Sequence, residues 1–288
     1  MKKKFKLVKN SKGYYSVGNP PKAHELSEYY SKKYFKINPR YAKKTKDFEE
    51  EYYKNQSLIR FFFIKKYLKV KQPSLLDLGA GTGRFIHYVS KYCKKVVGVD
   101  FSNSQLRYKL SKNASFLADE PVNFINQKKL EFNIITLNNV IEHALKPKKI
   151  LLNLKQKIKK NTFVLVSIPN DFSTHQKFLI KKKLVSKKYW LSFPDHLYYF
   201  DSKSFHKYIE SLGYTVVDTI TDFPVELLLF EKSFNYVERN IGKNVHRLRC
   251  NFVNYLCQNN NIFKVIDFFK SISKVEIGRN NYYLLKKR

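Results

Sequence analysis

Three glycines at alternating positions follow an acidic residue in the segment Asp77-Leu-Gly79-Ala80-Gly81-Thr-Gly83. Glycines allow a sharp turn and let a ligand approach the backbone, and a helix that begins after them offers unpaired N–H groups. A dinucleotide-binding fingerprint would require glycine at the sixth position counted from Gly79, where this chain has Arg84. The spacing is therefore unsuited to a pyrophosphate, and the acidic residue suits a ligand that carries an ammonium group.

A second carboxylate follows 17 residues after Gly83, where the β-rich run Val96-Val-Gly-Val ends in Asp100. In an α/β nucleotide-binding fold, an acidic side chain at the end of the second strand can accept hydrogen bonds from both hydroxyls of a ribose. The glycine loop and Asp100 together predict a site for a nucleoside that carries a positively charged group.

The elements that must position these residues form an α/β pattern. Short β-rich runs alternate with helical patterns, which predicts a parallel, doubly wound sheet with right-handed crossovers. The expected strands are 74–78, 96–100, 115–118, 132–137, 162–168, 214–220 and 281–286, and the main expected helices between them are 84–93, 148–160 and 202–212.

The ends of the chain differ from this pattern. Residues 1–55 are polar and rich in Tyr and Lys, so we interpret them as an N-terminal extension of irregular chain followed by short helices, with helical spacing at 23–35 and 47–68. Residues 56–288 would form the main domain. Within it, residues 224–276 are mainly helical and form an insertion before the last strand.

The two motifs, Leu76-Asp-Leu-Gly-Ala-Gly-Thr-Gly83 and Val97-Gly-Val-Asp100, resemble those of the class I S-adenosylmethionine (SAM)-dependent methyltransferases. The segment Phe132-Asn-Ile-Ile-Thr-Leu-Asn-Asn-Val-Ile-Glu-His143 is similar to the fourth-strand motif of the family's small-molecule branch. Ile168-Pro-Asn-Asp-Phe172 and Pro194-Asp-His-Leu-Tyr-Tyr-Phe200 resemble bacterial members associated with surface-polysaccharide biosynthesis. The resemblance implies a Rossmann-like, seven-stranded, mostly parallel sheet with an antiparallel last strand and helices on both faces.

The resemblance also implies a cofactor, SAM, which leaves as S-adenosylhomocysteine (SAH), and a role for each matching residue. Within the loop, the family often has a small residue where Ala80 stands. The implied contacts are Asp77 and the backbone of Gly79, Gly81 and Gly83 with the methionine end, Asp100 with the ribose, Phe101 beside the adenine, Asp119 with the adenine amino group, and Asn138 near the methionine moiety.

Methyl transfer from a sulfonium is an in-line displacement that alignment and desolvation can accelerate, so a base is optional. If the acceptor is a hydroxyl, a neutral histidine could remove its proton. His143 and His196 follow the fourth and fifth strands, on the side where such folds bind ligands. We prefer His196 as the base, with Asp195 to orient it. Alternatively, His196 only hydrogen-bonds its loop, and the Glu142-His143 pair caps a helix.

The formal net charge is +33, from 56 basic and 23 acidic residues. Such a balance points to nucleic acid or an anionic membrane surface. However, 47 of the basic residues are lysines spread along the whole chain, which biased genome composition would also produce. The charge thus leaves open an acidic or lipid-linked glycan substrate and a peripheral contact with an anionic membrane.

The preferred function is transfer of a methyl group to a small-molecule acceptor, at a hydroxyl of a sugar or surface-glycan precursor. A nucleic-acid methyltransferase is the first alternative, but the fourth strand leads into Leu137-Asn-Asn-Val140 rather than an Asp/Asn-Pro-Pro-Tyr type loop. We therefore expect no stable nucleic-acid partner. The second alternative is a SAM-binding protein without catalysis.

Three cysteines without a C-x-x-C pair suggest neither a disulfide framework nor a zinc site, so no metal is expected. Lysines at positions 6, 9 and 12 interrupt any apolar signal region near the N-terminus. We therefore expect a cytoplasmic protein, with the inner face of the membrane as a further location.

Overall fold

A computed structural model describes residues 5–29, 46–101, 106–127 and 129–288. At its centre is a seven-stranded sheet in the order β5-β4-β3-β6-β7-β10-β9. Neighbouring strands from β5 to β7 are parallel, whereas β10 is antiparallel to both β7 and β9. The strands are β3 Ser74–Leu78, β4 Lys95–Asp100, β5 Ala114–Ala118, β6 Ile134–Asn138, β7 Phe163–Pro169, β9 Tyr214–Thr221 and β10 Asn280–Lys287.

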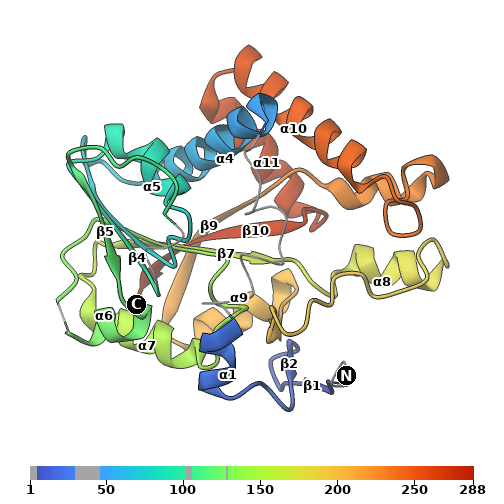
Figure 1. Ribbon diagram of the computed structural model, residues 1–288, viewed down its shortest axis with the longest axis horizontal. Helices are drawn as coiled ribbons and strands as arrows, with labels where there is room; N and C mark the ends of the chain where they lie inside the picture. Colours follow the sequence, from blue (N-terminus) through green and yellow to red (C-terminus); the bar gives the residue numbers. More distant parts are fainter. Residues whose placement is uncertain (1–4, 30–45, 102–105, 128) are drawn as a thin grey trace.

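Helices cover both faces of this sheet (Figure 1). One face carries α4 Asp47–Lys65, α5 Arg84–Val89, α10 Gly242–Asn259 and α11 Ile262–Lys274, and the other carries α6 Pro121–Gln127, α7 Pro147–Lys157 and α9 Ser202–Ser211. The sequence therefore predicted the Rossmann-like class, the seven strands and the antiparallel last strand correctly. The other helices within the described residues are α1 Ala23–Glu28 and α8 Thr174–Lys181, with the short 3-10 helices η2 Ser90–Tyr92, η4 Val225–Phe230 and η5 Lys232–Phe234.

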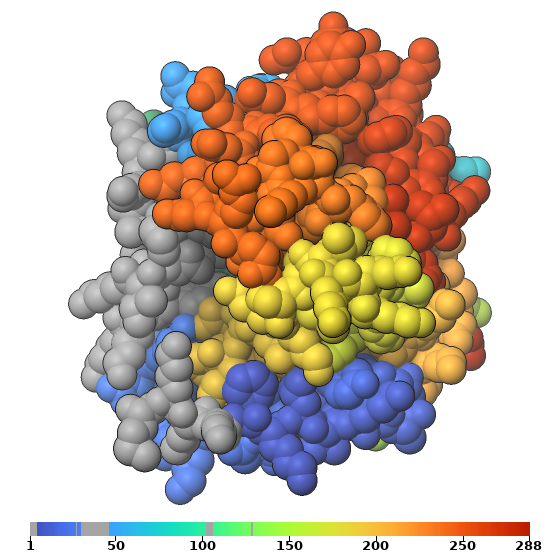
Figure 2. Space-filling view, turned by 90° about the vertical axis from the view of Figure 1, so that its right-hand side faces the viewer, coloured from blue at the N-terminus to red at the C-terminus, as the bar shows by residue number. Residues whose placement is uncertain are grey.

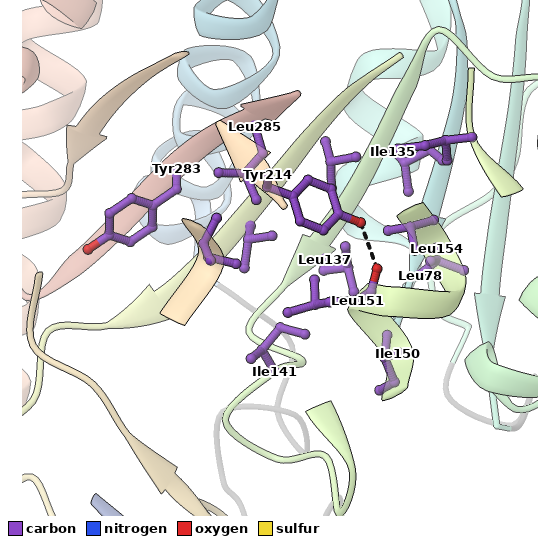
Figure 3. Packing of buried hydrophobic residues seen from close by; sticks show 14 of the residues in the cluster. Leu78, Ile135, Leu137, Ile141, Ile150, Leu151, Leu154, Tyr214, Tyr283 and Leu285 are labelled. Atoms are coloured by element: carbon purple, nitrogen blue, oxygen red, sulfur yellow. Dashed lines mark hydrogen bonds between the residues drawn. The ribbon is translucent and has the colours of Figure 1, made fainter. Parts of the chain in front are cut away.

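Alternation along the strands builds a separate apolar core on each face. Leu75 belongs to the core under α4, α5 and α11, and the next residue, Leu76, belongs to the core under α6, α7 and α9. This is the two-residue period expected when both faces of a parallel sheet are buried. In the second core, the Tyr214 hydroxyl donates a hydrogen bond to the Leu151 carbonyl over 2.8 Å, which satisfies the polar end of a fully buried ring (Figure 3).

The N-terminal segment contains strands that the sequence analysis missed. β1 Leu7–Lys9 pairs antiparallel with β2 Tyr15–Val17, and β2 pairs with β8 Tyr198–Tyr199. These strands have three, three and two residues, too few to show an alternating pattern. The partner of β2 is also far away in the chain, so the expectation of irregular chain in this segment was wrong.

Helical expectations at the two ends are largely confirmed. Helix α4 covers most of 47–68, and α1 is the part of 23–35 that lies among the described residues up to position 29. Between β9 and β10 the chain forms η4, η5, α10 and α11, as expected for a helical insertion. A domain boundary at residue 55 stays a prediction, and helix α4 runs continuously across this residue.

In the described part of the chain, none of the helices is both long and apolar enough to cross a membrane.

Candidate functional site

The glycine loop connects β3 to α5 and bends at three residues with positive φ. Gly79, Gly81 and Gly83 have φ angles of 79°, 52° and 78°, in a backbone region that residues other than glycine rarely adopt. A Cβ atom on Gly79 would lie 2.4 Å from Val140, and one on Gly83 would lie 2.4 Å from Leu106. A Cβ on Gly81 would have nothing within 4 Å among the described residues. Two glycines therefore permit close packing, and Gly81 borders open space.

Asp100, at the end of β4, is tied directly to this loop. The Gly81 N–H donates a hydrogen bond to the Asp100 carboxylate over 2.7 Å. Burial raises the pKa of Asp100, although the backbone N–H groups of Gly81 and Phe101 lower it. The structure thus brings Asp100 and the glycine loop together, as the sequence predicted.

Two residues expected beside the adenine lie next to Asp100. Phe101 follows it directly, and 57% of this residue is exposed, which leaves ring surface for a flat ligand. The Asp119 N–H donates a hydrogen bond over 2.8 Å to the Asp100 carbonyl, which places Asp119 at the same edge of the sheet. Their contacts with a cofactor stay predictions.

Asp77 is buried, and its carboxylate is held by neighbouring strand β6. Thr136 Oγ1 donates to Asp77 Oδ1 over 2.5 Å, and Asn138 Nδ2 donates to the same oxygen over 3.0 Å. Arg60, on α4, donates to Asn138 Oδ1 over 2.9 Å. Sequence reasoning found Asp77 and Asn138 but missed Thr136 and Arg60, because their contacts depend on how β6 and α4 pack in the folded chain.

Burial raises the pKa of Asp77 to about 6, since a carboxylate in a dry environment is poorly solvated. The hydrogen bonds from Thr136 and Asn138 and the positive charge of Arg60 act in the opposite direction. A cationic ligand at this edge would offset the remaining cost of the negative charge. The buried carboxylate and the open space at Gly81 therefore fit a ligand of the kind that the sequence predicts.

A second group of side chains lies on the loops that follow β6 and precede β8. The His143 and His196 rings meet edge to face, with centroids 4.8 Å apart. His143 Nδ1 lies 2.6 Å from the carbonyl oxygen of Asp195. His196 Nδ1 is buried and has no hydrogen-bond partner among the described residues. Sequence reasoning chose these two histidines, and the structure brings them together.

Burial lowers the pKa of His196 well below its ordinary value, with further contributions from His143 and Arg279. The Asp195 carboxylate accepts hydrogen bonds from the hydroxyls of Tyr29 and Ser192. Asp195 touches the site through its backbone carbonyl, which faces His143. Orientation of His196 by the Asp195 side chain stays a prediction.

Glu142 completes this second group. It is buried, its Oε1 accepts a hydrogen bond from Asn139 Nδ2 over 2.9 Å, and its Oε2 has no partner among the described residues. Helix α7 begins at Pro147 with Lys146 as its N-cap and no side-chain cap. The Glu142-His143 pair therefore does not cap this helix, which removes one alternative from the sequence analysis.

A buried ion network lies after β7, in the segment that the sequence analysis quoted as Ile168-Pro-Asn-Asp-Phe172. Asp171 Oδ1 accepts a hydrogen bond over 2.8 Å from Arg279, whose Nε lies 3.6 Å from the Glu226 carboxylate. Helix α8, which follows this segment, is capped by Ser173, whose Oγ accepts a hydrogen bond from the Gln176 N–H over 3.1 Å. Sequence reasoning missed Arg279 and Glu226, which come from segments far from Asp171 in the chain.

This geometry defines an α/β protein whose candidate ligand site lies at the carboxyl ends of β3, β4 and β6. Residues 45–219 match the protein family described as "Methyltransferase domain", and the chain belongs to this family.

One curated relative is the probable S-adenosylmethionine-dependent methyltransferase CRG1 of Saccharomyces cerevisiae. It is 32% identical over 94 residues, which make up 31% of this chain and 32% of that protein. The chain thus matches about a third of the length of this relative.

Solved structures share the fold. The plantazolicin methyltransferase BamL, in complex with a desmethyl analogue and SAH, has a TM-score of 0.54 and 14% identity, over 91% of this chain and 94% of that one. The 1,6-didemethyltoxoflavin-N1-methyltransferase of Burkholderia thailandensis has a TM-score of 0.52 and 12% identity, over 98% of each chain. A SAM-dependent methyltransferase from Archaeoglobus fulgidus has a TM-score of 0.51 and 13% identity, over 93% of this chain and 100% of that one.

Proposed function

We propose that this protein transfers a methyl group from SAM to a hydroxyl of a small molecule, a sugar or surface-glycan precursor. The observation that carries the proposal is that the buried Asp77 carboxylate, the Gly81 backbone and the Asp100 carboxylate come together at the carboxyl ends of β3 and β4. Asp77 would face the cationic methionine end, and Asp100 the ribose hydroxyls. When bound, SAM supplies an activated methyl group on a sulfonium.

Two of the solved structures with this fold support a small-molecule acceptor. BamL holds a plantazolicin analogue, and the Burkholderia thailandensis enzyme holds 1,6-didemethyltoxoflavin. The sugar or glycan acceptor rests on the sequence motifs quoted above. Acidic and lipid-linked glycans remain within the proposal because of the net charge of +33.

His196 is our proposed general base. Its Nδ1 has no hydrogen-bond partner among the described residues, and its ring lies against His143 in the loop that follows β6, so this nitrogen can accept the proton of an acceptor hydroxyl. Asp195 precedes His196 in the loop before β8. The hydrogen bond from the Tyr199 hydroxyl to the His196 carbonyl, over 3.0 Å, fixes the backbone of this loop.

The direct test is calorimetric titration with SAM and SAH. We expect the wild type to bind both ligands and Asp100→Ala to lose binding, because this variant removes the ribose contact and the tie to Gly81. Asp267→Ala, which alters a surface ion pair with Lys66, serves as the control and should bind like the wild type. Absence of binding in the wild type would reject the methyltransferase proposal.

Two alternatives are tested by the same protein preparation. A binding protein without catalysis would take up SAM but transfer no methyl group to any sugar, glycan precursor or RNA supplied. A nucleic-acid methyltransferase would methylate RNA in preference to nucleotide sugars. His196→Ala should retain SAM binding and slow methyl transfer, so equal loss of binding in this variant and Asp100→Ala would contradict the division of roles.

We further propose that the enzyme works in the cytoplasm at an anionic membrane surface. Phe178 on α8 and Phe230 on η4 are 42% and 49% exposed, and their rings lie 5.9 Å apart. Lys182 Nζ lies 5.9 Å from the centre of the Phe178 ring, beside the exposed Lys181 and Lys183. Helix α8 (yellow) lies on the face shown in Figure 2, next to the orange segment that follows β9. Exposed rings flanked by lysines suit a surface of anionic lipid.

Vesicle sedimentation tests this contact. We expect vesicles that contain phosphatidylglycerol to retain the protein at low salt, and neutral phosphatidylcholine vesicles not to retain it. The double variant Phe178→Ser, Phe230→Ser should lose retention, and Tyr255→Ser, which removes another exposed ring on α10, should not. Equal retention of both variants would reject this surface as the membrane contact.

A further inference from the structure

Glu142, His143 and His196 each offer one ligand atom, and these three atoms lie within 4.8 Å of one another. One carboxylate and two imidazoles form a ligand set that divalent transition metals use, with positions left open for water or substrate. We propose that these three residues bind a divalent transition-metal ion of the Zn²⁺ or Mn²⁺ type. This site was not expected from the cysteine spacing, and its ligands come from two loops that meet only in the folded chain.

The tautomer of the His143 ring supports this assignment. Its Nδ1 lies 2.6 Å from the Asp195 carbonyl, and a carbonyl oxygen can only accept a hydrogen bond. Nδ1 therefore carries the proton, and in the neutral ring Nε2 keeps its lone pair. Histidines that bind metals are held in this way, with the second ring nitrogen donating to a carbonyl or a carboxylate. Nε2 lies 3.9 Å from Glu142 Oε1.

Unsatisfied polar atoms are the second, independent observation. Glu142 is 1% exposed, yet its Oε2 has no hydrogen-bond partner among the described residues, and neither has the buried His196 Nδ1. Burial without a partner destabilises the folded state for a polar group, and more so for a charged one. A bound cation would satisfy the carboxylate of Glu142 directly.

The spacing sets how far the side chains must move. Ligand atoms around a tetrahedral zinc ion lie about 3.3 Å apart, given bonds of about 2.0–2.1 Å. A separation of up to 4.8 Å therefore requires the side chains of Glu142, His143 and His196 to move closer together as the ion binds. Arg279 is the nearby cation that opposes binding, and its contacts with Asp171 and Glu226 offset its charge.

The position of the site suggests what the ion would do, and this step rests on the proposed function. Val140, in the same loop as Glu142 and His143, packs against Gly79 of the glycine loop. A metal ion here could hold the acceptor oxygen and lower the pKa of its hydroxyl, whose proton would leave to solvent. The oxygen would then form the bond to the methyl carbon as the carbon–sulfur bond breaks, with the electron pair remaining on sulfur. A ring nitrogen that holds the ion cannot accept the proton, so the ion would replace His196 as the group that activates the hydroxyl.

Metal binding is measured without SAM or acceptor, so its failure is distinct from failure of the proposed function. After dialysis against a chelator, the protein is titrated with Zn²⁺ and with Mn²⁺, and folding of each variant is checked by circular dichroism. We expect one equivalent of metal in the wild type. We expect a loss of affinity of at least about tenfold in His143→Asn and in Glu142→Gln, which keeps the shape of the side chain.

His246→Asn is the matched control, because His246 also lies beside a glutamate, with Nε2 3.3 Å from Glu49, and should leave the affinity unchanged. The absorption spectrum of the Co²⁺-loaded wild type gives a second readout that requires no variant, and it should show a coordination shell with histidine nitrogen. Absence of saturable binding in the wild type, or equal affinity in His143→Asn and His246→Asn, would overturn the assignment.

Discussion

At the scale of single residues, the charge of Asp77 has opposite effects on folding and on ligand binding: it lowers the stability of the fold and favours a cationic ligand. Its carboxylate is buried beside the glycine loop, where burial raises the pKa to about 6. The hydrogen bonds from Thr136 and Asn138 reduce the cost of the charge but do not remove it. We infer that the charge is kept for a cationic ligand, because the fold alone would be more stable without it.

We therefore expect Asp77→Asn to raise the free energy of unfolding at about pH 8 by roughly 1–3 kcal/mol. Asparagine keeps the acceptor oxygen and loses the charge. The pKa of Asp77 rises on folding from 3.8 to about 6, so the cost is absent when both states are protonated, below about pH 4, and is complete above about pH 6. Urea unfolding of both proteins at pH 4 and pH 8 measures this difference.

The same variant should bind SAM more weakly than the wild type. A stabilisation equal at the two pH values would show that the charge is not its cause. Unchanged SAM affinity would show that Asp77 does not face the cationic end of the cofactor.

At the scale of elements, different glycines of the loop serve different purposes: Gly79 permits close packing, and Gly81 leaves room for a ligand. Gly79→Ala should destabilise the protein strongly, because its Cβ would lie 2.4 Å from Val140 at a φ of 79°. Gly81→Ala should cost only about 1–2 kcal/mol for the positive φ, because its Cβ meets no atom of the described residues within 4 Å. Its methyl group would nevertheless occupy the space that we assign to the cofactor.

We expect Gly81→Ala to stay folded and lose most of its SAM affinity, as measured by thermal unfolding and calorimetry on the same sample. If Gly81→Ala bound SAM like the wild type, the open space at Gly81 would not be the cofactor site.

The same scale shows what the sequence could predict. All seven strands of the main sheet lie within two residues of their expected ends. The signal is clearest for the buried parallel strands β3, β6 and β7, which are continuous apolar runs bounded by turns. The positions of Asp77, Gly81 and Asp100 followed from these strands, since each lies at or just after a strand end. Arg60 could not be placed beside Asn138, because its position depends on how α4 packs against the sheet and not on any local motif.

At the scale of the whole molecule, the residues that escaped prediction are those that meet only after the chain has folded. Strand β8 finds its partner β2 about 180 residues earlier in the chain, and Arg279 joins Asp171 and Glu226 from the start of β10. Short strands and buried ion networks leave no periodic signal in the sequence. The +33 charge is the opposite case, since it is plain in the sequence but does not identify a partner.

The salt dependence of binding distinguishes the effect of the surface lysines from that of the proposed cofactor site. Exposed lysines attract RNA and anionic vesicles through long-range forces, so retention on both should fall steeply from low to high salt. The SAM site that we propose depends instead on the buried Asp77 and on Asp100, which accepts a hydrogen bond from Gly81, and short contacts of this kind are weakly screened. We therefore expect SAM affinity to change by less than about twofold over the same range, measured by calorimetry beside filter binding of RNA. A parallel fall of SAM affinity and RNA retention would mean that the surface lysines, and not Asp77 and Asp100, dominate cofactor binding.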